Sequence, residues 1–561
     1  MKKIYALLLA CFCLLQQFPS QAQSGGNCQA ATATSLLDAN SVTATVGPGG
    51  TLWPEGYVVP NSLPDPVNAI FTGGLWIGGF DPAGNLKMAA QTYSSTFNNE
   101  YFPGPLDPTT GETSMETCQN WDLIFKVTQS EIDDFLADLS DNDVLDEQHP
   151  SILGWPGRGN TNFSEIHSFD LPDQELAPFV DTDSDGSYNP LNGDYPAIKG
   201  DEANWWITND AGGIHATTMG DPLQFEIQIM AFAHASENPA IDNTTFYDLK
   251  ITNRSLEPLD STMITLWVDP DLGCYTDDYV GCSPEHDLAF VYNADDQDGE
   301  PGCSCTQGIN TYCSVIPVLG IKILESPEQE NGEEAGLTTF GAYNNGSVGT
   351  MPPATTDPAN ALEYYRLMSG SWRDGSPFTQ GGDGYQDGAP TPYLFPDNPS
   401  DSMGWSMCTA NLASGDPRIL MSTGNIRMEP GESVNVSYAV TLVEAVPHPC
   451  PDITPLVDAF DEVEQYYSGL ATATEDVELI NSQVVAFPNP SREEVQITLK
   501  TLDEELEQVI LMDAQGKPVR QYNRLSGHQL VIRKENLSAG IYFYQVRTSA
   551  GKAANGKVVF L

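Results

Sequence analysis

The sequence predicts a mainly β protein, with a multidomain β-sandwich body that has few helices and a small C-terminal immunoglobulin-like β-sandwich. Short apolar runs alternate with polar residues at a period of two and end at Gly, Pro, Asn or Asp, which is typical of half-buried strands. The chain has 561 residues, beyond the roughly 250–300 at which one core stops growing, so several domains are expected. Hydrophobic residues make up 40% of the chain, enough to form sizeable cores.

The N-terminal residues are typical of an export signal, which we place at residues 1–22. Two lysines precede an apolar run over residues 4–15, and small residues then offer a cleavage site after Ala22. The run is too short to cross a bilayer core about 30 Å thick. No later stretch approaches the roughly 18 apolar residues of a spanning helix, so we predict no transmembrane helix. Residues 23–50 form an extended lead-in.

Residues 51–470 form an acidic, β-rich body, for which we expect two subdomains without a defined boundary. Helical periodicity is limited to residues 130–139 and 452–470. Small residues follow the second helix, so residues 471–483 are predicted to be a linker. Strands are expected at residues 71–80, 225–229, 247–251, 263–268, 315–321 and 433–443.

Residues 484–561 form the predicted C-terminal sandwich, and their charge differs sharply from that of the body. From residue 486 to the end there are ten Lys and Arg against eight Asp and Glu, whereas residues between the signal and this point carry 11 basic and 69 acidic side chains. Such a shift indicates a domain boundary.

The acidity of the whole chain limits its partners. The formal net charge is −54, from 23 basic and 77 acidic residues. This charge repels phosphate backbones and anionic lipid head groups, so nucleic acid is excluded as a partner. The excess negative charge must be balanced by solvent, counter-ions or bound metal.

Motifs of the C-terminal module occur in a fixed order: a Pro-Asn-Pro opening, an Asp-Ala-Gln-Gly turn, Leu-Ser-Ala-Gly-Ile-Tyr, and a terminal Gly-Lys-Val-Val. This order resembles the type A C-terminal sorting domain of the type IX, or Por, secretion system. The resemblance implies that the type IX machinery delivers the protein to the outer cell surface or medium, and that a sortase-like protease can process it. The matching sorting-motif residues are Pro488, Asn489, Pro490, Gly540, Tyr542, Gly556 and Lys557.

Parts of the body are also similar to large uncharacterised secreted proteins that carry this sorting domain. That resemblance implies no known activity. The similar segments are residues 74–79, 102–107, 177–181, 200–206 and 269–273.

An acidic motif at residues 181–194 predicts a calcium site. Carboxylates at alternate positions followed by Gly can wrap the chain around one hard cation, as in EF-hand and thrombospondin type 3 loops, which this segment resembles. Asn192 stands where an EF-hand has its bidentate Glu, so that ligand is either missing or supplied by Asp194. The alternative is a solvated acidic turn. The predicted Ca²⁺ ligands are Asp181, Asp183, Asp185, Ser187 and Asp194.

Two looser acidic groups lie further along the chain, and the sequence leaves calcium binding open at both. One has four aspartates between residues 269 and 278, and the other has Asp295, Asp296 and Asp298. Five cysteines, from Cys274 to Cys313, accompany these groups. In an exported chain such a cluster predicts two local disulfides rather than a metal site, and the odd count of nine mature cysteines leaves one thiol over.

Signatures of common enzymes are absent from the sequence, including HExxH, GxSxG, the P-loop and GxGxxG. His215 and His234 lie near Asp210 and Glu226 in sequence, and each is expected to be structural. Aromatic side chains such as Trp205, Trp372 and Trp405 can stack on sugars or fill cores. We therefore predict a secreted surface protein with a calcium-stabilised binding or structural body, which recognises a glycan or another surface ligand. The alternative is a secreted hydrolase of polysaccharide or protein.

Overall fold

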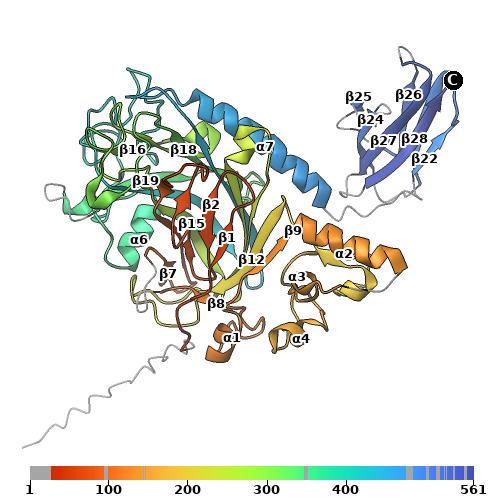
Figure 1. Cartoon of the computed structure of the whole chain (residues 1–561), viewed down its shortest axis with the longest axis horizontal. Helices are drawn as coiled ribbons and strands as arrows, with labels where there is room; N and C mark the ends of the chain where they lie inside the picture. Colours follow the sequence, from red (N-terminus) through yellow and green to blue (C-terminus); the bar gives the residue numbers. More distant parts are fainter. Residues whose placement is uncertain are drawn as a thin grey trace, which may run out of the picture. The chain divides into compact units, whose positions relative to one another are not determined.

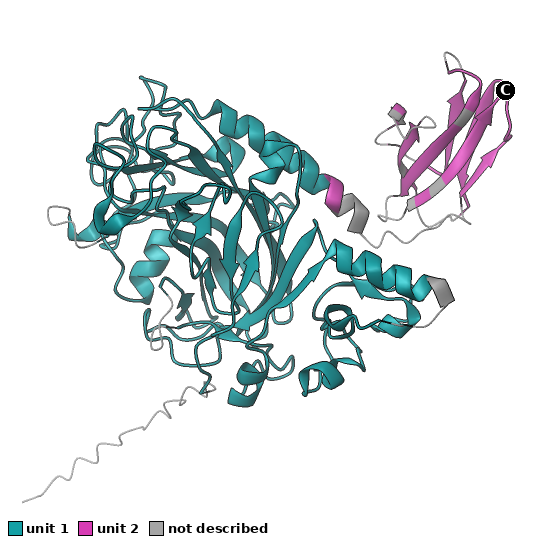
Figure 2. Ribbon diagram, viewed as in Figure 1, with its two compact units in different colours: residues 1–468 teal, residues 469–561 magenta. Residues whose placement is uncertain are grey.

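The computed structural model describes residues 27–93, 99–142, 145, 147–345, 352–474, 484–500, 505–512, 518–522, 525, 527–534, 537–548 and 553–561. The chain forms two compact units, Met1–Ser468 and Gly469–Leu561 (Figure 2). The first unit holds residues 51–468 of the predicted body, and the division of that body into two subdomains stays a prediction. The predicted signal peptide, residues 1–22, lies outside the described residues.

The predicted lead-in contributes strands to the first unit. In a four-stranded antiparallel sheet, β1 (Ser35–Leu37) pairs with β2 (Thr43–Val46), followed by β4 (Tyr57–Val58) and β5 (Asn68–Ile70). Leu37, Ala44 and Val46 of the first two strands are fully buried, so residues 35–46 belong to the folded body rather than to an extended lead-in. Because the surrounding residues are small and polar, these strands were not predicted from the sequence.

The largest sheet is antiparallel and has nine strands. Its central strands are buried along most of their length, including all of β13 and residues 436–442 of β21. The strands run in the order β16 (Asp278–Ser283), β17 (Leu288–Asn293), β18 (Val318–Glu325), β21 (Ser433–Val443), β14 (Thr244–Asn253), β13 (Phe225–Ala233), β12 (Glu202–Asn209) and β8 (Phe102–Pro103), with β9 (Phe125–Thr128) also paired to β12. Figure 1 labels β12, β16 and β18 among them.

A six-stranded antiparallel sheet packs against it. The indole N–H of Trp53, which follows β3, donates to the Tyr247 hydroxyl of β14 at 2.7 Å and so connects the two sheets. The strands are β19 (Thr339–Asn344), β20 (Pro417–Met428), β15 (Leu259–Asp269), β6 (Thr72–Phe80) and β3 (Thr51–Leu52), with β7 (Leu86–Ala90) also paired to β6. The mainly β fold class is confirmed.

Two helices pack on these sheets. A Cβ atom at Gly78 of β6 would lie 3.0 Å from the Tyr365 ring of α6 (Ala361–Met368), and one at Gly320 of β18 would lie 2.5 Å from the Phe460 ring of α7 (Thr454–Thr474). Glycine at these two positions therefore allows each helix to approach its sheet closely. The described part of α7 reaches Thr474, four residues into the predicted linker, and residues 475–483 of that linker lie outside the described residues.

The remaining helices are short and lie around the sheets. None of the helices among the described residues is long and apolar enough to cross a membrane. The α-helices are α1 (Met115–Asn120), α2 (Gln129–Asn142), α3 (Pro150–Leu153), α4 (Phe163–His167) and α5 (Pro239–Asp242), and the 3₁₀ turns are η1 (Pro190–Asn192), η2 (Pro284–His286), η3 (Thr306–Gly308) and η4 (Pro353–Thr355).

Disulfides staple the loops of the body. The predicted cysteine cluster forms two local bridges, Cys274–Cys305 and Cys303–Cys313, so that prediction is confirmed. Two longer bridges, Cys28–Cys118 and Cys408–Cys450, join more distant segments. The fifth member of the cluster, Cys282, is the leftover thiol and is fully buried in β16.

The second unit is a small two-sheet sandwich, as predicted. One sheet has the order β22 (Val484–Phe487), β23 (Glu494–Leu499) and β26 (Gln529–Arg533), and the other has β25 (Pro518–Tyr522), β24 (Leu506–Met512), β27 (Gly540–Thr548) and β28 (Ala553–Phe560). One hydrophobic core joins side chains of both sheets, among them Val495, Leu511 and Val558. Alternation places these residues on the inner faces.

Candidate functional site

The predicted calcium motif is the loop of a small β-hairpin. Strands β10 (Phe179–Val180) and β11 (Tyr195–Pro196) pair antiparallel, with Val180 opposite Tyr195, so residues 181–194 form one closed loop. This hairpin brings Asp194 back beside the start of the acidic run. The sequence alone did not reveal the two strands because each has only two residues.

Asp194 is the buried anchor of this loop. Its side chain is fully buried, and its Oδ1 accepts hydrogen bonds from the backbone N–H and the hydroxyl of Thr182, both at 2.8 Å. Its Oδ2 accepts from the Asn189 N–H at 2.8 Å. The carboxylate therefore holds both arms of the loop together.

Three of the five predicted ligands converge. Oxygens of Asp181, Asp183 and Asp194 lie within 4.8 Å of one another. Calcium binds oxygens at about 2.3–2.6 Å, so ligands on opposite sides of one ion are about as far apart as these. The Gly186 N–H donates to Asp181 at 2.8 Å and is the main cause of a lowered pKa for that carboxyl, which is therefore ionised at neutral pH.

Asp185 and Ser187 do not join this group. The Asp185 Oδ1 accepts from the Ser187 N–H at 2.8 Å, which closes a local turn at the exposed tip of the loop. Gly186 lies in the left-handed region, with φ 79°. The alternation in sequence therefore supplies two of the three carboxylates, and the third comes from the far end of the hairpin.

A second convergent group includes one residue that the sequence analysis missed. Oxygens of Asp269, Asp271 and Asp416 also lie within 4.8 Å of one another. Asp416 is remote in sequence, and a lone aspartate before a strand gave no signal. Of the third predicted acidic group, Asp295 and Asp296 are exposed, and Asp298 is buried.

The predicted histidines have structural positions. His215 is buried, with Nδ1 2.7 Å from the Met88 carbonyl oxygen and Nε2 2.7 Å from that of Asp210. His234 pairs with Asp201 at 2.9 Å. Of the predicted aromatic side chains, Trp205, Trp206, Trp372 and Trp405 are all buried, as expected for core residues.

One open cavity of about 770 Å³ lies between α1 and the segment after α4. Four acids line it: Asp107, Glu112, Glu116 and Asp170. The Asp107 carboxylate accepts the N–H groups of Thr109 and Thr110 at 2.8 and 2.9 Å, and these bonds lower its pKa. A general acid needs the opposite shift.

In the second unit, Asn489 fixes the Pro-Asn-Pro segment to the last strand. Its Nδ2 donates to the Lys557 carbonyl at 2.6 Å, and its Oδ1 accepts from the Val559 N–H at 2.8 Å. The flanking residues Pro488 and Pro490 lie in the same bend after β22. The first and last sorting motifs are therefore one structural feature.

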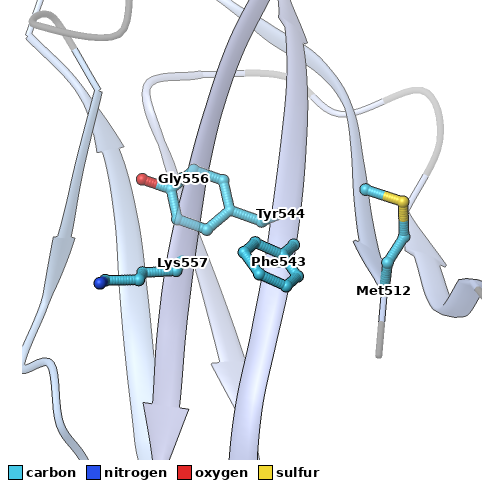
Figure 3. Close-up of a pocket in the computed structure, with 5 residues that line it drawn as sticks. All are labelled: Met512, Phe543, Tyr544, Gly556 and Lys557. Atoms are coloured by element: carbon cyan, nitrogen blue, oxygen red, sulfur yellow. The ribbon is translucent and has the colours of Figure 1, made fainter. Parts of the chain in front are cut away.

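The other sorting-motif residues lie on β27 and β28. Tyr544 of β27 lies directly opposite Gly556 of β28 (Figure 3). A Cβ atom at Gly556 would lie 2.3 Å from the Tyr544 ring. Tyr542 is buried, and its hydroxyl donates to the Ser538 carbonyl at 3.0 Å. Gly540 begins β27 and has open space where a Cβ would be.

An exposed row crosses three strands of this sheet. Met512, Phe543 and Lys557 are neighbours in the strand register, and with Tyr544 and Gly556 they line an open pocket of about 400 Å³ (Figure 3). Phe543 is 44% exposed.

Comparisons with known proteins identify the second unit. Residues 485–560 match the family model of the secretion system C-terminal sorting domain. No curated protein matches the chain. Among solved structures, a polysaccharide lyase matches with 11% sequence identity and a TM-score of 0.17. The match covers 60% of this chain and 34% of the lyase chain. A likeness this weak carries no argument about fold or activity. The chain therefore carries a type IX sorting domain, and it is a secreted protein directed to the cell surface.

Proposed function

We propose that the protein is a type IX-exported surface protein with a binding or structural body, which calcium stabilises at the loop of residues 181–194. Export is supported by the match of residues 485–560 to the C-terminal sorting-domain family. The observation that supports calcium is the convergence of Asp181, Asp183 and Asp194 within 4.8 Å. The loop holds three acidic side chains close together, although like charges repel one another. A bound cation would offset that repulsion.

Calcium suits this loop better than magnesium. The hairpin loop offers carboxylate oxygens from two separate arms and is partly exposed, so water can complete an irregular coordination shell. Magnesium requires near-ideal octahedral geometry and loses its water reluctantly. Extracellular calcium modules bind with Kd on the order of 10⁻⁴–10⁻³ M, which is the range we expect here.

Thermal unfolding of the purified mature chain, residues 23–561, tests the proposal. At calcium ten times above Kd, one site in the folded state contributes about 1.4 kcal/mol. Calcium should therefore raise Tm by a few degrees over chelator, and Asp183→Asn should remove part of that rise. Asp134→Asn is the matched control, because Asp134 is an exposed helical aspartate. If Asp183→Asn leaves both the calcium-induced rise in Tm and calcium binding unchanged, the loop is a solvated turn.

The export route has two steps in this proposal. Residues 1–22 direct the chain across the inner membrane, and the type IX machinery then recognises the sorting domain. A sortase-like protease removes that domain and attaches the body to the surface. Mass spectrometry of surface-released protein should find peptides from the body but none from residues 484–561. Recovery of an intact C-terminus at the surface would exclude the cleavage step.

A binding role is favoured over hydrolysis by one acid of the cavity near α1. Asp107 has a lowered pKa, and none of the residues that line this cavity is a histidine. A glycan array with a parallel panel of hydrolase substrates separates the two classes. Binding without turnover supports the proposal, and turnover of any substrate overturns it.

A further inference from the structure

Three aspartates meet where two strands of the six-stranded sheet lie side by side. Asp269 is the last residue of β15, Asp271 follows in the next turn, and Asp416 directly precedes β20. Their carboxylate oxygens lie within 4.8 Å of one another. Asp269 is 2% exposed, and the other two are half-buried.

Asp269 has one oxygen without a partner. Its Oδ2 accepts from the Tyr93 hydroxyl at 2.6 Å and pairs with Arg418 at 3.1 Å. Its Oδ1 is buried and has no hydrogen-bond partner among the residues that the structure describes. A buried, unpartnered carboxylate oxygen is strongly unfavourable, so its presence beside two further carboxylates points to a ligand.

The Asp271 carboxylate is half-buried and converges on the same point. Among the described residues, we find no hydrogen bond or ion pair to its side chain. Its carboxylate oxygens lie close to those of Asp269 and Asp416, so the three groups repel one another when no cation lies between them.

Arg418 balances only part of the charge. It forms ion pairs with Asp269 and with Asp416, and it also donates to the Asp416 carbonyl oxygen at 2.8 Å. Three carboxylates and one guanidinium leave two negative charges. One divalent cation would neutralise them.

We propose that Asp269, Asp271 and Asp416 bind a divalent cation, with calcium as the best match. The ligands are hard oxygens from three positions on two separate segments, so water and backbone carbonyls would complete the six to eight ligands that calcium takes. The ion would fasten the turn after β15, which leads to the Cys274–Cys305 bridge, to the start of β20. This site is separate from the loop of residues 181–194 and does not depend on it.

Calcium titration of the mature chain, by calorimetry and by terbium luminescence, tests the proposal. Asp271→Asn should lower the stoichiometry by one ion, because it removes a ligand charge without removing a hydrogen bond. Asp183→Asn reports on the other loop, and Asp134→Asn should bind like the wild type. If Asp183→Asn alone loses an ion, this second site is wrong and the proposed function stands. If Asp271→Asn alone loses an ion, this second site is supported and the calcium site proposed at residues 181–194 is wrong.

Thermal unfolding supplies a readout that a purely structural role would not change. In chelator, Asp271→Asn should raise Tm, since it removes repulsion among the three carboxylates. In saturating calcium the same variant should melt below the wild type. This reversal is expected only if the wild-type carboxylates bind an ion. A shift of the same sign in both conditions, with unchanged stoichiometry in Asp271→Asn and Asp416→Asn, would overturn the proposal.

Discussion

Asp194 binds Thr182 through one oxygen, which accepts both the backbone N–H and the side-chain hydroxyl of Thr182 at 2.8 Å. The two residues lie at opposite ends of the acidic loop, and Asp194 is fully buried. This carboxylate therefore has a structural role that does not require an ion. Asp183, which is exposed and accepts one hydrogen bond from Asn192 at 3.0 Å, has no comparable role.

Asp194→Asn should destabilise the body with or without calcium. The amide group of Asn can accept on only one side, so an N–H of Thr182 or Asn189 would face an NH₂ group. Hydrogen bonds to charged groups contribute about 1.5–3 kcal/mol, and we expect a loss of that size. Urea unfolding in chelator measures it. Asp183→Asn should be near the wild type in the same buffer, and equal losses in the two variants would contradict this assignment.

Removal of residues 484–561 should leave the body in the periplasm of a host with a type IX system. Residues 485–560 match the C-terminal sorting domain of a secretion system. Cell fractionation and blotting measure the distribution of the truncated chain. The control is a reporter with a signal peptide fused to residues 484–561, which should reach the surface. Undiminished surface delivery of the truncated body would contradict the prediction.

Gly556→Ala should unfold the sorting domain and reduce surface delivery. Its Cβ would lie 2.3 Å from the Tyr544 ring, and overpacking of this kind typically destabilises by about 1–3 kcal/mol. Gly540→Ala is a matched control in the same motif set, because nothing lies within 4 Å of its Cβ position. Thermal melts of the mature chain should show a lower transition for the second unit in Gly556→Ala only. Equal melting of the two variants would show that Tyr544 moves aside.

The sequence predicted the longer strands well, because apolar and polar residues alternate along them. Alternation identified residues 225–229 and 247–251, and both lie inside buried strands of the nine-stranded sheet. It missed residues 35–46, whose short strands lie among small and polar residues. A strand of two to four residues has too few positions to establish a period, so only its partner in the fold reveals it.

The candidate cation sites show a similar limit. Local spacing selected Asp181 and Asp183, whose oxygens converge, and also Asp185, whose oxygen closes a turn. Asp416 could not have been found, because strand pairing between β15 and β20 brings it to Asp269. Ligands from one loop are encoded locally, whereas ligands from different strands depend on topology.

The cysteines should give one free thiol per mature chain. Eight of the nine are paired, and Cys282 is buried, with burial as the main cause of its raised pKa. Alkylation of the native protein should therefore label none of them, and alkylation after unfolding without reduction should label Cys282 alone. Peptide mapping checks both results. Labelling of Cys303 or Cys313 in the unreduced chain would contradict the pairing.

Buried acids near Cys274 should make the cation-free body less stable as pH rises. Asp278 is fully buried. Within the described part of the chain its Oδ1 has no hydrogen-bond partner, and its Oδ2 accepts from the Leu272 N–H at 3.1 Å. Burial raises its pKa well above the ordinary value, with a further contribution from Asp277. Burial likewise raises the pKa of Asp298 to about 7.

These raised pKa values set the sign of the pH effect. Above about pH 4 the unfolded chain has released protons that the folded chain still holds on Asp278 and Asp298. The free energy of unfolding therefore falls as pH rises from about 4 to 7, by up to about 1.4 kcal/mol per pH unit for each such proton. Asp278→Asn cannot ionise and keeps the acceptor for Leu272. It should flatten the slope and be more stable than the wild type at pH 7.5, by at least about 1 kcal/mol. Urea unfolding in chelator from pH 5 to 8 measures this. Asp134→Asn should follow the wild-type slope, and a parallel slope for Asp278→Asn would show that Asp278 is ionised in the fold.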